Sequence, residues 1–135
     1  MTSIITWIKL GGAALCSALA FMVGGFDTLI KVLLILSVID YITGVSAAIV
    51  TKKLSSQTGF YGILKKTAIL CVVACSHLLG QTMGIEHIRT AVIGFYIANE
   101  GISIAENSAR LGVPLPKKLM EILSQLKEKE DDDDL

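Results

Sequence analysis

The segment Arg89–Arg110 reads RTAVIGFYIANEGISIAENSAR, and its mixture of apolar and polar residues decides how the chain must fold. The stretch between the two arginines is long and apolar enough to cross a membrane as an α-helix. At about 100° of rotation per residue, its polar side chains collect on one side of that helix. We call this set the polar stripe, and it comprises Tyr96, Asn99, Glu100, Ser103, Glu106, Asn107 and Arg110. Because an ionisable group inside a bilayer costs several kcal/mol unless it meets water or a partner, the polar stripe is predicted to line a pore or to face protein.

Small residues occupy the opposite side of the same helix. They follow the spacing at which two membrane helices approach each other closely, and they are Gly94, Ala98, Gly101 and Ala105. A similar row near the N-terminus comprises Gly11, Ala14 and Ala18. We call these two rows the small-residue faces and predict that they pack against other helices.

The rest of the chain is also apolar. It has 135 residues, of which 53% are hydrophobic, and its mean hydropathy is +0.66. Three further runs are nearly free of charge, at about 10–25, 29–50 and 67–83. Each is close to the length needed to cross about 30 Å of hydrocarbon. The sequence therefore predicts an all-α integral membrane protein whose membrane domain, residues 1–112, has about four transmembrane helices, the fourth at 90–110. It leaves open whether this fourth segment crosses the bilayer or lies at its surface.

The segment 51–66 is predicted to be a basic loop, in which Ser55 or Ser56 starts a short helix and Gly59 and Gly62 give bends. It contains Lys52, Lys53, Lys65 and Lys66 and no acidic residue. Basic loops stay on the cytoplasmic side, so both termini are predicted to be cytoplasmic as well. The four lysines are expected to hold anionic headgroups at the membrane surface. A cleaved signal peptide is the competing interpretation of the N-terminus, but its basic region would be one lysine, Lys9.

Asp40 is a second acid at membrane depth. It is expected either to hydrogen-bond a neighbouring helix or to act directly in a pore, and the sequence leaves both roles open. Cys71 and Cys75 are one helical turn apart, but no complementary pair of ligands accompanies them, so no metal site and no other cofactor is predicted. The sequence shows no nucleotide-binding loop and no paired nucleophile and base. These observations argue against an enzyme, and nothing in the sequence indicates a nucleic-acid partner.

The segment 113–135 is predicted to be cytoplasmic. Gly112 and Pro114 end the fourth helix, and Pro116 opens an amphipathic helix. The apolar side of this helix would carry Leu119, Ile122, Leu123 and Leu126. The acidic tail EKEDDDDL follows, and it is interpreted as a solubilising end or as a repulsive segment that limits assembly.

The ordered set of motifs resembles the toxin-secretion/phage-lysis holin family. The resemblance runs from about residue 29 to residue 126 and rests on Asp40-x-x-Thr43-Gly44, Lys53-Leu54-Ser55-Ser56, Gly62-Ile63-Leu64-Lys65-Lys66, Asn99-Glu100-x-x-Ser103-x-x-Glu106-Asn107 and Leu111-Gly112-Val113-Pro114. It implies a protein that accumulates in the bacterial cytoplasmic membrane and forms homo-oligomeric lesions. Through these lesions a phage endolysin, or a large toxin in some relatives, would cross without obligatory contact. One departure is that Gly80-Gln81 stands where the family pattern has an acid.

Two other classes of function also fit four short membrane helices. A small multidrug or ion transporter would use the membrane glutamate for proton exchange, but only Tyr41 and Tyr96 are at hand to form an aromatic site for a cation. A structural membrane subunit would instead use the polar stripe to bind a partner helix.

Overall fold

The computed structural model describes residues 1–122, 124 and 125, and over these residues the regular structure is helical. The long helices are α1 (Thr2–Met22), α2 (Thr28–Val50), α3 (Ser56–Met83) and α4 (Ile88–Arg110). Three of them, α1, α2 and α3, are long and apolar enough to cross a membrane. Helix α4 has 23 residues, so it is about 34 Å long, but its polar stripe lowers its hydropathy.

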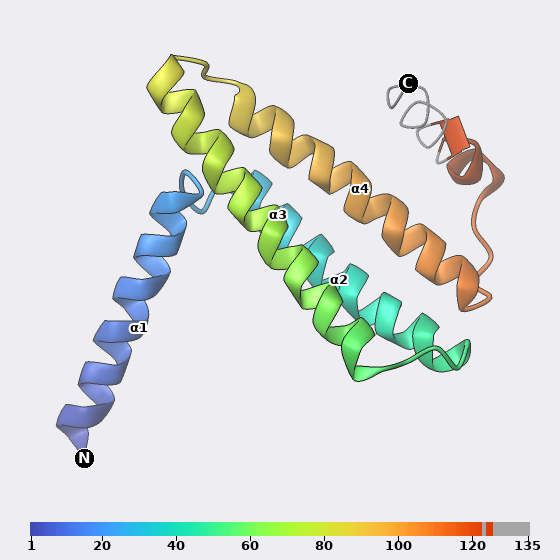
Figure 1. The fold of residues 1–135 in the computed structure, drawn as a ribbon, viewed down its shortest axis with the longest axis horizontal. Helices are drawn as coiled ribbons and strands as arrows, with labels where there is room; N and C mark the ends of the chain where they lie inside the picture. Colours follow the sequence, from blue (N-terminus) through green and yellow to red (C-terminus); the bar gives the residue numbers. More distant parts are fainter. Residues whose placement is uncertain (123, 126–135) are drawn as a thin grey trace.

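Helices α2, α3 and α4 form a bundle in which α2 and α4 run parallel and α3 runs antiparallel to both (Figure 1). We call the end with the α2–α3 turn the inner end and the end with the α3–α4 turn the outer end. A cluster of buried apolar side chains joins the three helices in the outer half, and its members are Ile30, Leu33, Ile69, Val73 and Ile93. In a bilayer the helical fold satisfies the backbone polar groups of each segment internally.

Helix α1 projects away from this bundle (Figure 1). It has no buried residue, and its small-residue face is not packed within the chain, since Gly11, Ala14 and Ala18 are all exposed. The predicted bounds of 10–25 were wrong, because the helix begins at Thr2 and ends at Met22. Polar residues at its start are compatible with the helix, as shown by Thr6, whose hydroxyl donates a 2.8 Å hydrogen bond to the Thr2 carbonyl oxygen.

The predicted basic loop 51–66 is helical from Ser56 onward, so the predicted helix start at Ser55 or Ser56 is confirmed, but the helix is long and not short. Helix α3 begins at Ser56, and the Ser55 side chain caps it by accepting a 3.1 Å hydrogen bond from the Thr58 backbone N–H. The glycines of this region do not bend the chain. They allow α2 to approach, because a Cβ on Gly62 would lie 3.2 Å from the Tyr41 ring. This contact outweighs the low helix propensity of glycine.

The helix ends follow from their local sequences. Asp27 caps α2 by accepting a 3.1 Å hydrogen bond from the Ile30 backbone N–H. Helix α4 ends at Arg110, and Gly112, the predicted C′ residue, completes a Schellman motif with φ of 81°. At the end of α2 the same motif has Lys52 in the left-handed position, with φ of 56°.

The C-terminal segment is described only in part. The backbone is helical at residues 117–122, 124 and 125, immediately after Pro116 as predicted. Leu119 and Ile122 are exposed, whereas Leu123, Leu126 and the acidic tail lie outside the described residues.

Candidate functional site

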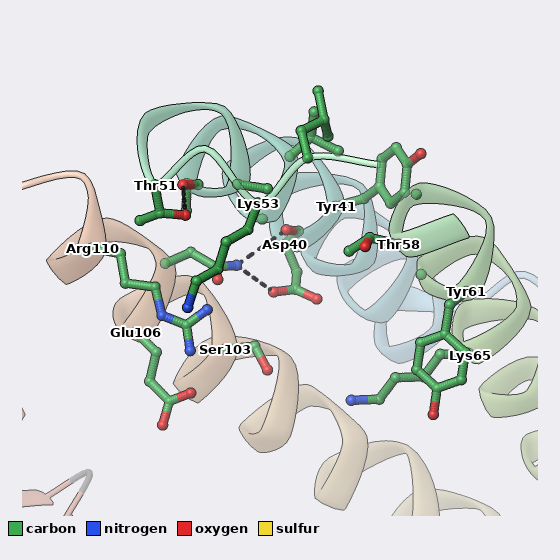
Figure 2. Close-up of a pocket in the computed structure, with 18 of the residues that line it drawn as sticks. Asp40, Tyr41, Thr51, Lys53, Thr58, Tyr61, Lys65, Ser103, Glu106 and Arg110 are labelled. Carbon is green, nitrogen blue, oxygen red and sulfur yellow. Dashed lines mark hydrogen bonds between the residues drawn. The ribbon is translucent and has the colours of Figure 1, made fainter. Parts of the chain in front are cut away.

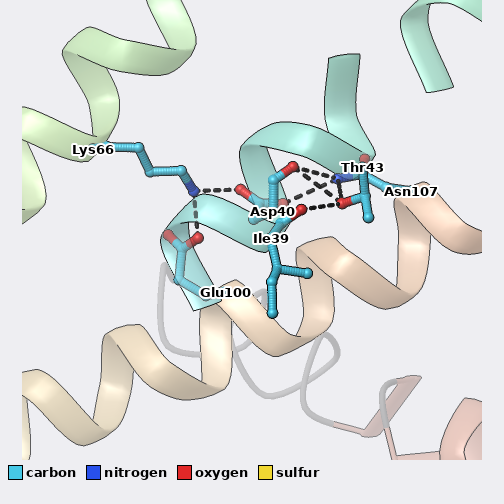
Figure 3. A network of polar contacts seen from close by, with 6 residues as sticks. All are labelled: Ile39, Asp40, Thr43, Lys66, Glu100 and Asn107. Atoms are coloured by element: carbon cyan, nitrogen blue, oxygen red, sulfur yellow. Dashed lines mark hydrogen bonds and ion pairs between the residues drawn. The ribbon is translucent and has the colours of Figure 1, made fainter. Parts of the chain in front are cut away.

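Three charged side chains, one from each helix of the bundle, meet between α2, α3 and α4 (Figure 3). The Lys66 ammonium donates hydrogen bonds to the carboxylates of Asp40 and Glu100. The Glu100 side chain is 2% exposed, and the Lys66 side chain is 17% exposed. We call these three residues the ionic triad.

The ionic triad lies near the middle of the bundle. Asp40, Lys66 and Glu100 are each ten residues from the inner end of their helix, a distance of about 15 Å at 1.5 Å per residue. Removing charges from water is costly in the low dielectric of such a site, and only close pairing with opposite charges offsets that cost. The triad has two carboxylates for one ammonium, so further hydrogen-bond donors are needed.

Asn107 supplies such a donor. Its side-chain amide donates a 3.0 Å hydrogen bond to Asp40 Oδ1 and a 3.2 Å bond to the Thr43 hydroxyl (Figure 3). The Thr43 hydroxyl in turn donates a 2.9 Å bond to the Ile39 carbonyl oxygen. Within the described part of the chain, every buried side-chain nitrogen or oxygen has a hydrogen-bond partner. The polar network is therefore fully satisfied, as a buried network must be if it is to be stable.

A polar groove leads from the triad to the inner end of the bundle (Figure 2). Its volume is about 440 Å³, and it is open to the outside of the bundle. Asp40 and Lys66 lie at its deep end, and its walls carry Lys53, Lys65, Ser103, Glu106 and Arg110. On the outer side of the triad, the apolar cluster fills the space between the helices. The bundle thus has a polar groove in its inner half and an apolar cluster in its outer half.

The predicted polar stripe is divided among these environments. Tyr96 packs against the apolar cluster, and Asn99 is half-buried. Glu100 and Asn107 join the polar network, while Ser103, Glu106 and Arg110 line the groove. The structure thus brings the predicted membrane acids, Asp40 and Glu100, together through a lysine.

Lys66 was misplaced by the sequence interpretation, which assigned it to the membrane surface with the other lysines. Lys52 is exposed, and Lys53 and Lys65 line the groove, but Lys66 belongs to the ionic triad. The need of two buried acids for a counter-charge on a neighbouring helix points to a lysine of this region, but it does not distinguish Lys66 from Lys65.

Part of the small-residue face of α4 points away from the other helices of the bundle. Gly94 and Ala98 are exposed, whereas Ala105 is buried. A Cβ added to Gly94 or Gly101 would meet no atom within 4 Å. Much of this face is therefore available to lipid or to another helix.

A second polar contact, which the sequence interpretation missed, closes the outer end. The Arg89 guanidinium donates hydrogen bonds of 2.7 and 3.2 Å to the Asp27 carboxylate and one of 3.2 Å to the Gly25 carbonyl oxygen. Hydrogen bonding to this guanidinium lowers the pKa of Asp27 below its usual range. The contact fastens the α1–α2 turn to the first turn of α4, and we call it the outer clamp.

Comparison with known proteins reveals a family match and several relatives. The model of the bacteriophage holin family matches residues 17–128. The chain is 41% identical over 131 residues to an uncharacterized 14.9 kDa protein of Clostridium perfringens, and the alignment covers 96% of this chain and 99% of that protein. It is 42% identical over 126 residues to an uncharacterized protein of Halalkalibacterium halodurans, with coverage of 89% and 93%. It is also 39% identical over 88 residues to a probable holin of Bacillus phage phi105, with coverage of 64% and 65%. No solved structure matches the chain.

Proposed function

Because this chain belongs to the bacteriophage holin family, we propose that it accumulates in the bacterial cytoplasmic membrane and assembles there into non-selective lesions. An endolysin or a large toxin would cross the membrane through these lesions. On this proposal the chain itself catalyses no reaction, and the cell wall is cleaved by the released endolysin.

The proposed topology has four spans with both termini in the cytoplasm. The basic residues Lys52 and Lys53 favour a cytoplasmic inner end, and α4 can span because α2 and α3 cover Glu100 and Asn107. A reporter fused after Lys53 should therefore be cytoplasmic, and a reporter fused after Glu86 should be external. A reporter fused after Pro116 should be cytoplasmic again, and an external reporter at that position would instead place α4 at the membrane surface.

The observation that carries the proposal is the ionic triad. In a single copy, Lys66 neutralises part of the charge of Asp40 and Glu100 and holds three helices together. The apolar cluster closes the outer half, so a dispersed copy leaves the membrane sealed. In a lesion the polar stripe would face water, and hydration of the charges would recover the cost of burying them. Copies would associate through the small-residue faces.

The experiment is timed lysis of bacteria that co-express the chain and a muralytic enzyme. Lys66→Met leaves two carboxylates facing each other, and breaking a buried pair in this way costs about 3–5 kcal/mol. We expect lysis to begin earlier than with the wild-type chain, at an equal amount of membrane-inserted protein. Lys65→Met is the matched control, because this adjacent lysine lies outside the triad.

Each outcome decides between classes of protein. Abrupt release of a cytosolic enzyme only when the muralytic enzyme is present supports a holin. Normal growth with an intact membrane at high expression contradicts the proposal. Saturable, substrate-specific flux without lysis would indicate the transporter alternative. Equal lysis times for the Lys66 and Lys65 variants would show that the triad does not hold the closed state.

A further inference from the structure

Helices α2 and α4 form a close pair that continues into the inner half of the bundle. They run parallel and lie side by side (Figure 1). The Asn107 amide of α4 donates hydrogen bonds to Asp40 and Thr43 of α2. Gly44 leaves room for this amide, because a Cβ there would lie 3.4 Å from Asn107 Nδ2. Membrane helices are held together by close packing and by hydrogen bonds between them, so α2 and α4 are expected to stay joined.

Helix α3 is attached differently in its two halves. In the outer half, Ile69 and Val73 belong to the apolar cluster, and a Cβ on Gly80 would lie 2.7 Å from Ile88 Cγ2 of α4. In the inner half, the polar groove of about 440 Å³ lies between the three helices, and its walls come from all of them. The inner half of α3 can therefore move without separating closely packed helices.

Tyr41 of α2 reaches across the groove to α3. Its ring lies against the backbone of α3 at Gly62, where a Cβ would be 3.2 Å from Tyr41 Cε2. Tyr41 follows Asp40 in α2, and Gly62 precedes Lys66 by about one helical turn in α3. The contact therefore sets the distance between α2 and α3 beside the ion pair of Asp40 and Lys66. We call the contact between Tyr41 and Gly62 the latch.

We propose that the inner half of α3 moves away from the α2–α4 pair when the chain opens, and that this movement breaks the latch and withdraws Lys66 from the triad. Local opening takes place where buried contacts are fewest. Displacement of α3 removes Lys66 from Glu100 and uncovers the side of α4 that lines the groove. It leaves the Asn107 bonds to α2 intact, whereas separation of α2 from α4 would break them. The inference rests on the proposed function, because opening means the change by which the polar stripe comes to face water.

Backbone hydrogen exchange tests this movement in the unmodified full-length chain in detergent. We expect the amides of residues 58–66 in α3 to exchange several-fold faster than those of 41–50 in α2 and 101–110 in α4, because α3 can leave while α2 and α4 protect each other. Equal or faster exchange in either of the other two segments would overturn the proposal. This measurement does not require the chain to form lesions.

Disulfides between helices then identify the moving helix. In a chain whose native cysteines are replaced by serine, Tyr41→Cys with Gly62→Cys joins α2 to α3 at the latch. Gly44→Cys with Asn107→Cys joins α2 to α4, where a Cβ on Gly44 would lie 4.0 Å from Asn107 Cγ. Each oxidised chain is placed in lipid vesicles that hold a fluorescent protein, and release of this protein is measured before and after a reductant is added. Both forms of a chain carry the same substitutions, so the difference between them reports the link alone.

We expect the α2–α3 disulfide to suppress release by roughly tenfold or more until it is reduced, because it locks the closed state. The α2–α4 disulfide should leave release unchanged. Equal release from the oxidised and reduced α2–α3 chains, or suppression by the α2–α4 disulfide, would overturn the proposal. Absence of release from the wild-type chain and from every reduced chain would instead contradict the proposed function, and hydrogen exchange would still decide whether the inner half of α3 is the part that moves.

Discussion

At the scale of single residues, the unequal charge of the ionic triad has a direct consequence for Glu100. Glu100→Gln leaves Lys66 paired with Asp40, so the closed bundle holds a neutral pair in place of a net negative charge. Because the remaining charges stay paired, we expect the closed state to lose no more than about 1 kcal/mol. The open state loses the hydration of a carboxylate that is 2% exposed in the closed state. Lysis should therefore begin later, opposite to the effect of Lys66→Met.

The measurement is the onset of lysis at matched levels of inserted protein. Glu86→Gln is the control, since this exposed residue of the α3–α4 turn undergoes the same chemical change. If both Lys66→Met and Glu100→Gln shifted lysis in the same direction, the charge balance of the triad would not be the quantity that controls opening.

The outer clamp makes stability depend on pH. Asp27 has a folded-state pKa below its unfolded value, and the Arg89 hydrogen bond is the main cause. Its contribution is therefore present above the unfolded pKa of about 4 and is lost as the pH falls through the lower folded pKa. Asp27→Asn keeps a residue able to cap α2 but removes the charge. We expect thermal unfolding in detergent to show a less stable variant at pH 7 and a difference that shrinks below pH 4. A constant difference across this range would contradict the clamp.

The sequence could not predict that Lys66 is the partner of the two membrane acids. Asp40 and Glu100 stand out in the sequence because each is an acid within an apolar segment. Lys65 and Lys66 are adjacent and look equivalent, but successive residues of a helix point about 100° apart. Only the packing of α3 against α2 and α4 decides that Lys66 faces the acids.

At the scale of helices, the predicted bounds were close to those of α2 and α4 but not to those of α1 and α3. The predicted segment 29–50 differs little from α2 (Thr28–Val50), and 90–110 differs little from α4. Helix α3 starts eleven residues before the predicted 67, because a charged residue ends an apolar run without ending a helix. Ser55, the capping residue, was the better signal for this boundary.

Gly24, in the α1–α2 turn, lies close to side chains of two other helices, α3 and α4. Gly24 has φ of 84°, and a Cβ there would lie 2.6 Å from Arg89 Nε and 2.6 Å from His77 Nδ1. Gly24→Ala should therefore both strain the backbone, at about 1–2 kcal/mol, and displace the outer clamp. Gly25→Ala is the matched control, since Gly25 also has a positive φ but has open space around it. We expect Gly24→Ala to lower the melting temperature in detergent more than Gly25→Ala does, and equal losses would leave backbone strain as the whole effect.

At the scale of the whole molecule, the described chain divides into two parts. In the bundle of α2, α3 and α4 the buried polar side chains all have hydrogen-bond partners, whereas α1 has no buried residue. The bundle pairs the charges of Asp40, Lys66 and Glu100 with one another and encloses its apolar cluster. Helix α1 buries none of its residues, so its stable environment must come from lipid or from other copies of the chain. Packing between membrane helices depends on close approach of small residues, and Gly11, Ala14 and Ala18 form a row of such residues along one side of α1.

Disulfide cross-linking between copies tests whether α1 mediates assembly through this side. Ala14→Cys is placed in a chain whose native cysteines are replaced by serine (Cys16→Ser, Cys71→Ser and Cys75→Ser). The control chain keeps Cys16 alone, which lies about 200° around the helix from Ala14. Because the small-residue face brings two backbones close together, mild oxidation in membranes should link the Ala14→Cys chains into dimers more completely than the control chains. Equal or weaker linkage at position 14 would exclude this face as the contact and would direct the search to the exposed Gly94 and Ala98 of α4.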